Sequence, residues 1–395
     1  MDSQDLEPLE NLGWDPGWAA AFAPFDGVGR QPARVVAAHR DSWVLATATG
    51  DRDASVSGRL RHQAIGPGDL PAVGDWVSAV VPGGGASGAG ANGAATPNAA
   101  TPAPEPAVIH AILPRRSAFQ RGGGDGTRSG SGRIADEQVM AANIDVALLI
   151  AGLDGDFNAR RLERYLAVAW SGGATPVVVL NKSDVADAAG NLAALIAAAA
   201  GVAPGVDVRA ISARTGDGVE ALASDHLRPG RTAVVLGSSG VGKSTLVNAL
   251  IGAERMRTND VRASDSRGRH TTTHRELVRL PGGGLLVDTP GIRSLGVTDA
   301  SDGMASAFAD IEDLADGCRF RDCGHDGEPG CAVRTALDDG RLSAARYASH
   351  RKLEREAAHV ARSADPMARA VERRKWKLIT ASVNEHMKHK YGSDR

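Results

Sequence analysis

Residues 237–244 read GSSGVGKS and constrain the possible folds more than any other stretch of this 395-residue chain. They fit the pattern G-x-x-x-x-G-K-[ST], directly after the apolar run 232–236 and before a stretch with helical periodicity. Glycines in such a loop let backbone N–H groups converge on phosphate oxygens, and the following helix start adds partial positive charge. The sequence therefore predicts a phosphate-binding loop, in which Lys243 reaches the β- and γ-phosphates and the Ser244 hydroxyl binds Mg2+.

Apolar runs rich in β-branched residues lie on both sides of this loop, and stretches with helical periodicity separate them. Such alternation predicts an α/β domain, with a parallel sheet and helices on both of its faces. From about Asp302 onward the apolar runs stop, and a cysteine-bearing segment and then helical sequence follow. The predicted strands are 144–151, 176–180, 206–211, 233–236 and 285–287, and the clearest predicted helices are 159–170 and 244–251.

Two polar motifs follow predicted strands and favour guanine as the base. In Asn181-Lys-Ser-Asp184, the Asp184 carboxylate can accept hydrogen bonds from guanine N1–H and the 2-amino group, which adenine does not offer. Asn181 would contact the Hoogsteen edge, and the Lys182 stem would lie along the base. In Ser212-Ala-Arg214, the Ala213 N–H would donate to guanine O6. The predicted nucleotide-binding residues are Asn181, Lys182, Ser183, Asp184, Ser212, Ala213, Gly237, Ser238, Ser239, Gly240, Val241, Gly242, Lys243, Ser244 and Thr245.

A third motif, Asp288-Thr-Pro-Gly291, follows the last apolar run. An aspartate at the end of a strand can hold the metal through water, and the Gly291 N–H can meet a γ-phosphate. The motif order is unusual, because ordinary GTPases carry the phosphate loop first and the base motif later. A site is assembled in space, so a circular permutation of the chain preserves it. The order therefore predicts a circularly permuted GTPase domain.

Short β-like runs near the N-terminus predict a small barrel, for which an OB-fold is the natural candidate. A Gly/Ala/Pro/Thr-rich stretch, 82–106, separates the last two runs and carries Glu105 as its one charge. This composition buries too little apolar surface to offset its ordering entropy, so the stretch is expected to be a disordered insertion. It would form the loop between the fourth and fifth strands. The predicted strands are 33–39, 42–48, 55–60, 76–81 and 107–113.

All three cysteines of the chain fall in one segment, Cys318-x4-Cys323-x-His325-x5-Cys331. Three thiolates and one imidazole at this spacing suit a closed, tetrahedral zinc site of the structural kind. The alternative interpretation is three buried free thiols beside an unrelated histidine. Because four protein ligands leave no open coordination position, the predicted Zn2+ has no catalytic role.

The C-terminal stretch 341–395 is strongly basic, with 14 Lys and Arg against six Asp and Glu. Helical periodicity and Trp376 make it suitable for contact with the phosphate backbone of RNA, although a solvated helix face is the common alternative. The whole chain has 45 basic and 47 acidic residues, so its net charge does not indicate RNA binding, and only local basic patches such as this one can support it.

The remaining composition excludes two classes of protein. Three cysteines exclude a disulfide scaffold and suit a reducing compartment. The acidic start MDSQDLEPLE lacks a secretion signal, and no apolar run reaches the ~18 residues of a membrane span. A cytoplasmic protein without a membrane partner, acting as a monomer, is therefore expected.

These motifs together resemble the RsgA (YjeQ) family, the circularly permuted GTPases that act on the small ribosomal subunit. The resemblance covers most of the chain, from the small barrel to the zinc motif 318–333, and includes the stretches 137–145 and 268–273. It implies that 268–273 is the first switch, in which Thr272 or Thr273 closes on Mg2+ when GTP is bound. The residues implied in catalysis are Lys243, Thr272, Thr273, Asp288 and Gly291, with His270 and His274 as further candidates for positioning water.

Ile292 follows Gly291 at the place where many GTPases carry the glutamine that orients the attacking water. An isoleucine side chain neither donates nor accepts a hydrogen bond. Hydrolysis is therefore predicted to be slow for the protein alone, and faster when a partner completes the site.

The resemblance implies a GTP hydrolase that binds the small ribosomal subunit and its rRNA, and that couples GTP hydrolysis to late subunit maturation and release of the factor. One alternative is a GTP-dependent RNA-binding switch with incidental hydrolysis, which Ile292 keeps open. A second is an ATP-using P-loop enzyme such as a kinase, which the base motif disfavours. The predicted parts are an N-terminal extension (1–29), an OB-fold-like barrel (30–116), the permuted GTPase domain (117–298) and a zinc-binding, basic helical domain (299–395).

Overall fold

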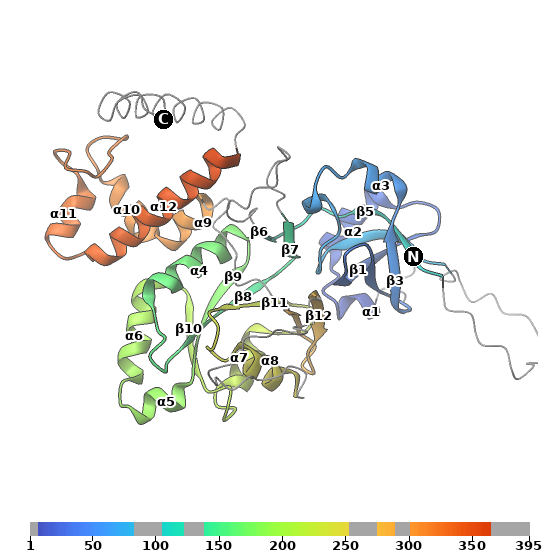
Figure 1. The fold of residues 1–395 in the computed structure, drawn as a ribbon, viewed down its shortest axis with the longest axis horizontal. Coiled ribbons are helices and arrows are strands. Elements are labelled where there is room, and N and C mark those ends of the chain that lie inside the picture. Colours follow the sequence, from blue (N-terminus) through green and yellow to red (C-terminus); the bar gives the residue numbers. More distant parts are fainter. Residues whose placement is uncertain (1–6, 83–104, 122–137, 253–274, 289–300, 365–395) are drawn as a thin grey trace, which may run out of the picture. The chain divides into compact units, whose positions relative to one another are not determined.

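The computed structural model describes residues 7–82, 105–121, 138–252, 275–288 and 301–364 (Figure 1). The chain divides into two compact units, one built from Met1–Gly123 and Asp136–Gly296, the other from Gly124–Ala135 and Val297–Arg395. Within the described residues, every strand belongs to the first unit and the second unit is helical. None of the helices in these ranges is both long and apolar enough to cross a membrane.

Five strands of the first unit close into the predicted N-terminal barrel. Their order is β1-β2-β3-β5-β4, and β4 pairs again with β1. β3 and β5 run parallel, whereas the other pairs are antiparallel. Fully buried side chains such as Val35, Leu45 and Ile109 fill the interior. The strands are β1 (Arg30–Ala38), β2 (Trp43–Thr47), β3 (Gly50–Val56), β4 (Trp76–Val80) and β5 (Ala107–Ile112).

The predicted strand 55–60 is wrong in its second half. β3 ends at Val56, and the helix α3 (Gly58–Gln63) begins two residues later. The Ser57 hydroxyl starts this helix by accepting a hydrogen bond from the Leu60 N–H at 3.2 Å. Leu60 still packs against the barrel core, but from a helix. The predicted insertion lies between β4 and β5 as expected, and its residues 83–104 lie outside the described residues.

The N-terminal segment, whose role the sequence does not indicate, packs on the barrel. It contains α1 (Glu7–Glu10), α2 (Pro16–Phe22) and a short 3-10 helix, η2 (Ala23–Phe25). The rings of Trp14 and Trp18 lie 4.8 and 6.1 Å from that of Trp76 in β4. Arg116 fixes the same segment, because it pairs with Asp15 at 2.6 Å and lies over the Trp18 ring. The extension is therefore part of the folded unit.

A second group of strands forms the predicted parallel sheet, in the order β10-β9-β8-β11-β13. β12, which the sequence did not predict, runs antiparallel beside β13 and also pairs with β1 of the barrel, at Ala37 and Glu276. The barrel and the parallel sheet are thus continuous. The strands are β8 (Val146–Gly152), β9 (Thr175–Asn181), β10 (Asp207–Ile211), β11 (Thr232–Gly237), β12 (Arg275–Arg279) and β13 (Leu285–Asp288); β6 (Ala118–Arg121) pairs separately with β7 (Gln138–Ala142).

Helices cover both faces of the parallel sheet. Val146, Leu148 and Ile150 of β8 share one core with α7 and α8. Ala147 and Leu149 point to the opposite face and are also completely buried, and α4 contacts β8 and β9. The helices are α4 (Ala159–Ser171), α5 (Ser183–Ala188), α6 (Leu192–Val202), α7 (Val219–His226) and α8 (Lys243–Ile251), so the two clearest helix predictions are confirmed.

A buried arginine joins four segments of the first unit. Arg34 in β1 is 2% exposed and donates to the carbonyls of Leu12, Gly74 and Asn143. It also donates to the Thr232 hydroxyl at the start of β11, at 2.8 Å. Burial lowers the pKa of Arg34 to about 10, and the guanidinium lies 5.4 Å from the Trp76 ring centre. This one side chain therefore connects the N-terminal segment, the barrel and the strand that leads into the phosphate loop.

Replacing Arg34 by methionine is expected to lower the free energy of unfolding of the first unit by about 2–4 kcal/mol, because several buried acceptors lose their donor. Urea unfolding followed by tryptophan fluorescence measures this, since Trp76 lies beside Arg34 and the rings of Trp14 and Trp18 lie close to Trp76. Arg40→Met, at an exposed position, is the control and should change stability by ~0.5 kcal/mol or less. Equal unfolding curves for the two variants would contradict this role.

The second unit contains α9 (Ser301–Ala307), α10 (Ala309–Asp316), α11 (Ala332–Asp338) and α12 (Ala344–Ala364). Arg346 of α12 is its central polar residue: it pairs with Asp310 at 2.6 Å, donates to the Ala307 carbonyl and lies over the buried Phe308 ring. α12 confirms helix in the first part of the basic stretch 341–395. Trp376 and the rest of that stretch lie outside the described residues.

Candidate nucleotide site and metal centre

The predicted motifs meet at one edge of the parallel sheet. Asn181, Gly237 and Asp288 are the last residues of β9, β11 and β13, and Ser212 directly follows β10. In the register, Asn181 is opposite both Ile211 and Gly152, and Gly237 is opposite Ile150. Because these strands are parallel, their carboxyl ends lie side by side. The sheet therefore brings together motifs that are far apart and permuted along the chain.

Asn181 connects the base motif to the phosphate loop. Its side chain is 2% exposed, and Nδ2 donates to the Val241 carbonyl at 2.8 Å. Its Oδ1 accepts from the Ala213 N–H at 2.9 Å. Gly242, with φ of 92°, passes so close that a Cβ at this position would collide with the Asn181 amide. In this structure the Asn181 amide and the Ala213 N–H are hydrogen-bonded to each other. Their contacts with the edge of guanine stay predictions.

Asp184, the predicted reader of the base, is held as an ionised acceptor. Arg214 Nη2 lies 2.6 Å from Asp184 Oδ2, and Ser212 also donates to this carboxylate. The hydrogen bonds from Arg214 and Ser212 lower the pKa of Asp184. A carboxylate that stays charged is the stronger acceptor for two N–H donors of a base.

The phosphate loop has the shape that its glycines predict. Gly240 and Gly242 have φ values of 85° and 92°, in the left-handed region that glycine adopts readily. α8 begins at Lys243, so the N–H groups of Lys243, Ser244 and Thr245 lie at a helix start, where anions are favoured. The Lys243 ammonium donates to the carbonyls of Gly237 and Ser238. The lysine is therefore at the loop, as expected from the motif.

Two acidic residues of the loop after β8 contact these motifs, and the sequence reasoning missed them. Asp154 pairs with Lys182, whose Nζ also donates to the Gly240 carbonyl at 2.7 Å. Asp156 accepts from the Ser238 hydroxyl at 2.8 Å and pairs with Arg161 at 2.9 Å. Partial burial opposes ionisation of Asp156, but the hydrogen bonds from Ser238 and Arg161 outweigh it and lower its pKa. The sequence did offer one signal for these residues, because both aspartates come just after the predicted apolar strand 144–151.

Several residues that the sequence predicts for the catalytic site lie beyond the described part of the chain. Thr272, Thr273, Gly291, His270 and His274 lie outside the described residues, as does Ile292. The backbone of Asp288 ends β13, next to β11 and therefore at the correct edge of the sheet, and its side chain is not described. Their roles stay predictions.

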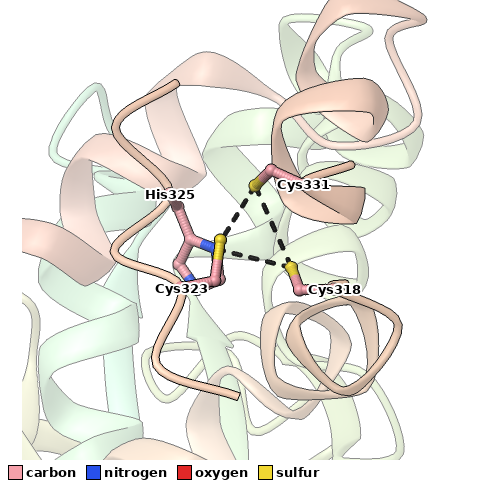
Figure 2. Close-up of side chains that lie close together, drawn as sticks. All are labelled: Cys318, Cys323, His325 and Cys331. Carbon is pink, nitrogen blue, oxygen red and sulfur yellow. Dashed lines mark hydrogen bonds between the residues drawn. The ribbon is translucent and has the colours of Figure 1, made fainter. Parts of the chain in front are cut away.

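The three cysteines and His325 form a cluster in the second unit (Figure 2). Their ligand atoms all lie within 4.8 Å of one another. Cys318 Sγ is 3.9 Å from Cys331 Sγ and 3.6 Å from His325 Nδ1, and His325 Nδ1 is 3.4 Å from Cys331 Sγ. Ligand atoms around a tetrahedral zinc lie about 3.5–3.8 Å apart, given the usual metal–ligand distances. The cluster therefore fits one metal ion.

Backbone N–H groups donate to two of the cysteine sulfurs in this cluster. The Ala332 N–H donates to Cys318 Sγ and the Arg334 N–H to Cys331 Sγ, both at 3.3 Å. Burial opposes ionisation of Cys318, but hydrogen bonds from the Val333 and Ala332 N–H groups hold its pKa below the ordinary value. All three donors come from the first turn of α11. The helix start thus favours the thiolate form of Cys318, which is the form that binds a metal.

A parallel sheet that gathers guanine and phosphate motifs at its strand ends, in permuted chain order, defines a circularly permuted GTPase. The RsgA GTPase family model matches residues 112–298. The chain is 47% identical over 375 residues to a protein of Opitutus terrae named small ribosomal subunit biogenesis GTPase RsgA, with 94% of this chain and 95% of that protein covered. The chain belongs to the RsgA family.

Further comparisons agree. A protein of the same name from Streptomyces coelicolor is 41% identical, covering 98% of this chain and 97% of its own. Among solved structures, YjeQ from Thermotoga maritima has a TM-score of 0.58 at 24% identity, covering 83% of this chain and 99% of its own. YloQ, described as a circularly permuted GTPase, has a TM-score of 0.56 at 22% identity, covering 84% and 96%. These two structures support the fold.

Proposed function

We propose that this protein hydrolyses GTP to GDP and phosphate and couples that reaction to late maturation of the small ribosomal subunit and to its own release from the subunit. The name of its curated relatives supports the ribosomal role. The observation that carries the nucleotide part is the Asn181 side chain, which binds the Val241 carbonyl of the phosphate loop and the Ala213 N–H of the second base motif. One guanine nucleotide can therefore contact the base motifs and the phosphate loop at the same time.

In this proposal Asp184 reads guanine and Lys243 neutralises charge on the β- and γ-phosphates. Ser244 and either Thr272 or Thr273 would hold Mg2+, which supplies further positive charge to the phosphates. Asp288 would hold that ion through water, and the Gly291 N–H would contact the γ-phosphate. These groups position and stabilise the transferring phosphoryl group, which is most of what a GTPase has to do.

Hydrolysis is proposed to be slow alone and stimulated by the small subunit, because Ile292 cannot orient water. Supplying one missing polar group to such a site is worth about 10²–10³ in rate. Phosphate release should therefore rise by about 10²-fold or more when purified small subunits are added, and stay at the basal rate with large subunits. If small subunits bind without raising the rate, the alternative applies: a GTP-dependent RNA-binding switch with incidental hydrolysis.

The flanking parts are proposed to bind rRNA, through the OB-like barrel and through the zinc-bearing helical unit with its basic tail. The protein would work as a monomer in the cytoplasm, where small subunits mature. The Cys318, Cys323, His325 and Cys331 cluster would hold one structural Zn2+, which stabilises the helical unit.

Cys331→Ser is expected to remove the zinc and destabilise the helical unit, because binding free energy at such a site contributes directly to folding. Zinc content should fall from one equivalent to near zero, and α10 and α11, which flank the cluster, should lose protection from hydrogen exchange. Asp339→Asn, an exposed change just after α11, is the control. A Cys331→Ser protein that still holds one zinc would exclude Cys331 as a ligand.

A further inference from the structure

The residues between the first two cysteines, 319–322, form an exposed turn that we call the knuckle. Phe320 of this turn is 43% exposed, whereas Phe308 of the same unit is completely buried. The Cys323 N–H donates to the Phe320 carbonyl at 3.3 Å, and the Arg319 N–H donates to the Gly330 carbonyl at 3.1 Å. Because Cys318 and Cys323 flank the turn, ligation of one metal ion would fix both of its ends. The knuckle thus presents an aromatic ring from a preorganised backbone.

The ring is accompanied by positive charge. The Arg319 guanidinium lies 5.5 Å from the Phe320 ring centre, and Arg321 is exposed on the other side of Phe320 in the chain. Two nearby acids are engaged elsewhere: Glu328 accepts three backbone N–H groups of its own loop, and Asp326 pairs with Arg351 at 3.6 Å. Asp322 is the one acidic residue within the knuckle.

We infer that the knuckle binds an unpaired RNA base, with Phe320 stacked on the face of the base and Arg319 and Arg321 on neighbouring phosphates. Aromatic rings combined with cations are the usual platform for single-stranded RNA, since every base has a face to stack. A turn whose ends are already fixed loses little entropy on binding. This inference rests on the proposed ribosomal function, because that function supplies the RNA.

The test uses the full-length, zinc-loaded protein and compares Phe320→Ala, Phe320→Leu and Phe320→Tyr. Affinity is measured by fluorescence anisotropy for a mixed-sequence single-stranded RNA and for an RNA duplex of equal length, and by co-sedimentation for purified small subunits. Phe320→Ala and Phe320→Leu should weaken single-strand binding about 5- to 150-fold, the effect of one lost stacked base, and leave duplex binding within about 2-fold. Phe320→Tyr should retain wild-type affinity.

Val185→Ala is the matched control, because Val185 is a 45% exposed apolar residue of α5 and lies outside both parts that are proposed to bind rRNA. The zinc content of each variant shows whether its helical unit is folded. If the Phe320→Ala protein loses its zinc, the comparison of the Phe320→Leu and Phe320→Tyr proteins tests the inference. Equal single-strand affinity for the Leu and Tyr variants would overturn the inference. Weaker binding to subunits with unchanged binding to RNA would also overturn it and indicate a protein contact. A wild-type protein that binds RNA through Phe320 but does not bind subunits would contradict the proposed function alone.

Discussion

Lys243→Ala is expected to lower the rate of GTP hydrolysis by about 10²–10³, the usual cost of removing one group that stabilises developing phosphate charge. Lys243 is the first residue of α8, and its ammonium already lies at the carbonyls of Gly237 and Ser238 in the phosphate loop. Substitution by alanine removes the positive charge and its two hydrogen bonds to the loop, and leaves the glycines of the loop unchanged in sequence. Phosphate release under single-turnover conditions, with the protein in saturating excess over GTP, is the measurement.

Lys352→Ala serves as the control, because Lys352 is an exposed lysine on α12 in the other unit and should leave basal hydrolysis unchanged. Thermal unfolding of the Lys243→Ala protein should match that of the wild type within a few degrees. A folded Lys243→Ala protein that keeps half of the wild-type rate would show that the loop at 237–244 is not the phosphate site.

The local parts of this structure could be predicted from the sequence. The phosphate loop is set by glycines that adopt positive φ, an apolar strand before it and a helix after it, all within twenty residues. The five parallel strands were found from their β-branched runs, and the metal cluster from four ligands within fourteen residues. In each case the signal lies within one short stretch of the chain, so the residue pattern indicates the element or the cluster.

Contacts between distant segments could not be predicted in this way. β12 pairs with β1 across more than two hundred residues, and Arg34 donates to Thr232, which lies 198 residues further along the chain. Asp154 and Asp156 belong to no short motif, and their role became visible only when β8 was placed between β9 and β11. Strand order in a sheet depends on packing of the whole domain, which a pattern along one segment does not encode.

The strand predicted at 55–60 failed for a different reason. An apolar residue at position 60 suits either a strand or a helix, and only the hydrogen bond from the Leu60 N–H to the Ser57 hydroxyl distinguishes them. Ser57, a residue type that often caps the start of a helix, was therefore the signal of a helix start.

The central claim is that the base motif at 181–184 and the phosphate loop at 237–244 bind the same nucleotide, although their chain order is permuted. Asp184→Asn tests it, because an asparagine amide can donate to the O2 of xanthine but cannot accept from both donors of guanine. Asp187→Asn, an exposed change on the same helix, is the control. The measurement is kcat/KM for GTP and for xanthosine triphosphate with each protein.

Asp184→Asn should lose roughly 10³-fold in kcat/KM for GTP, since mispaired polar groups are left at the base, and should gain a comparable factor for xanthosine triphosphate. Asp187→Asn should keep the wild-type preference. If the Asp184→Asn protein still hydrolyses GTP as well as the wild type and shows no gain with xanthosine triphosphate, the two motifs do not share a nucleotide.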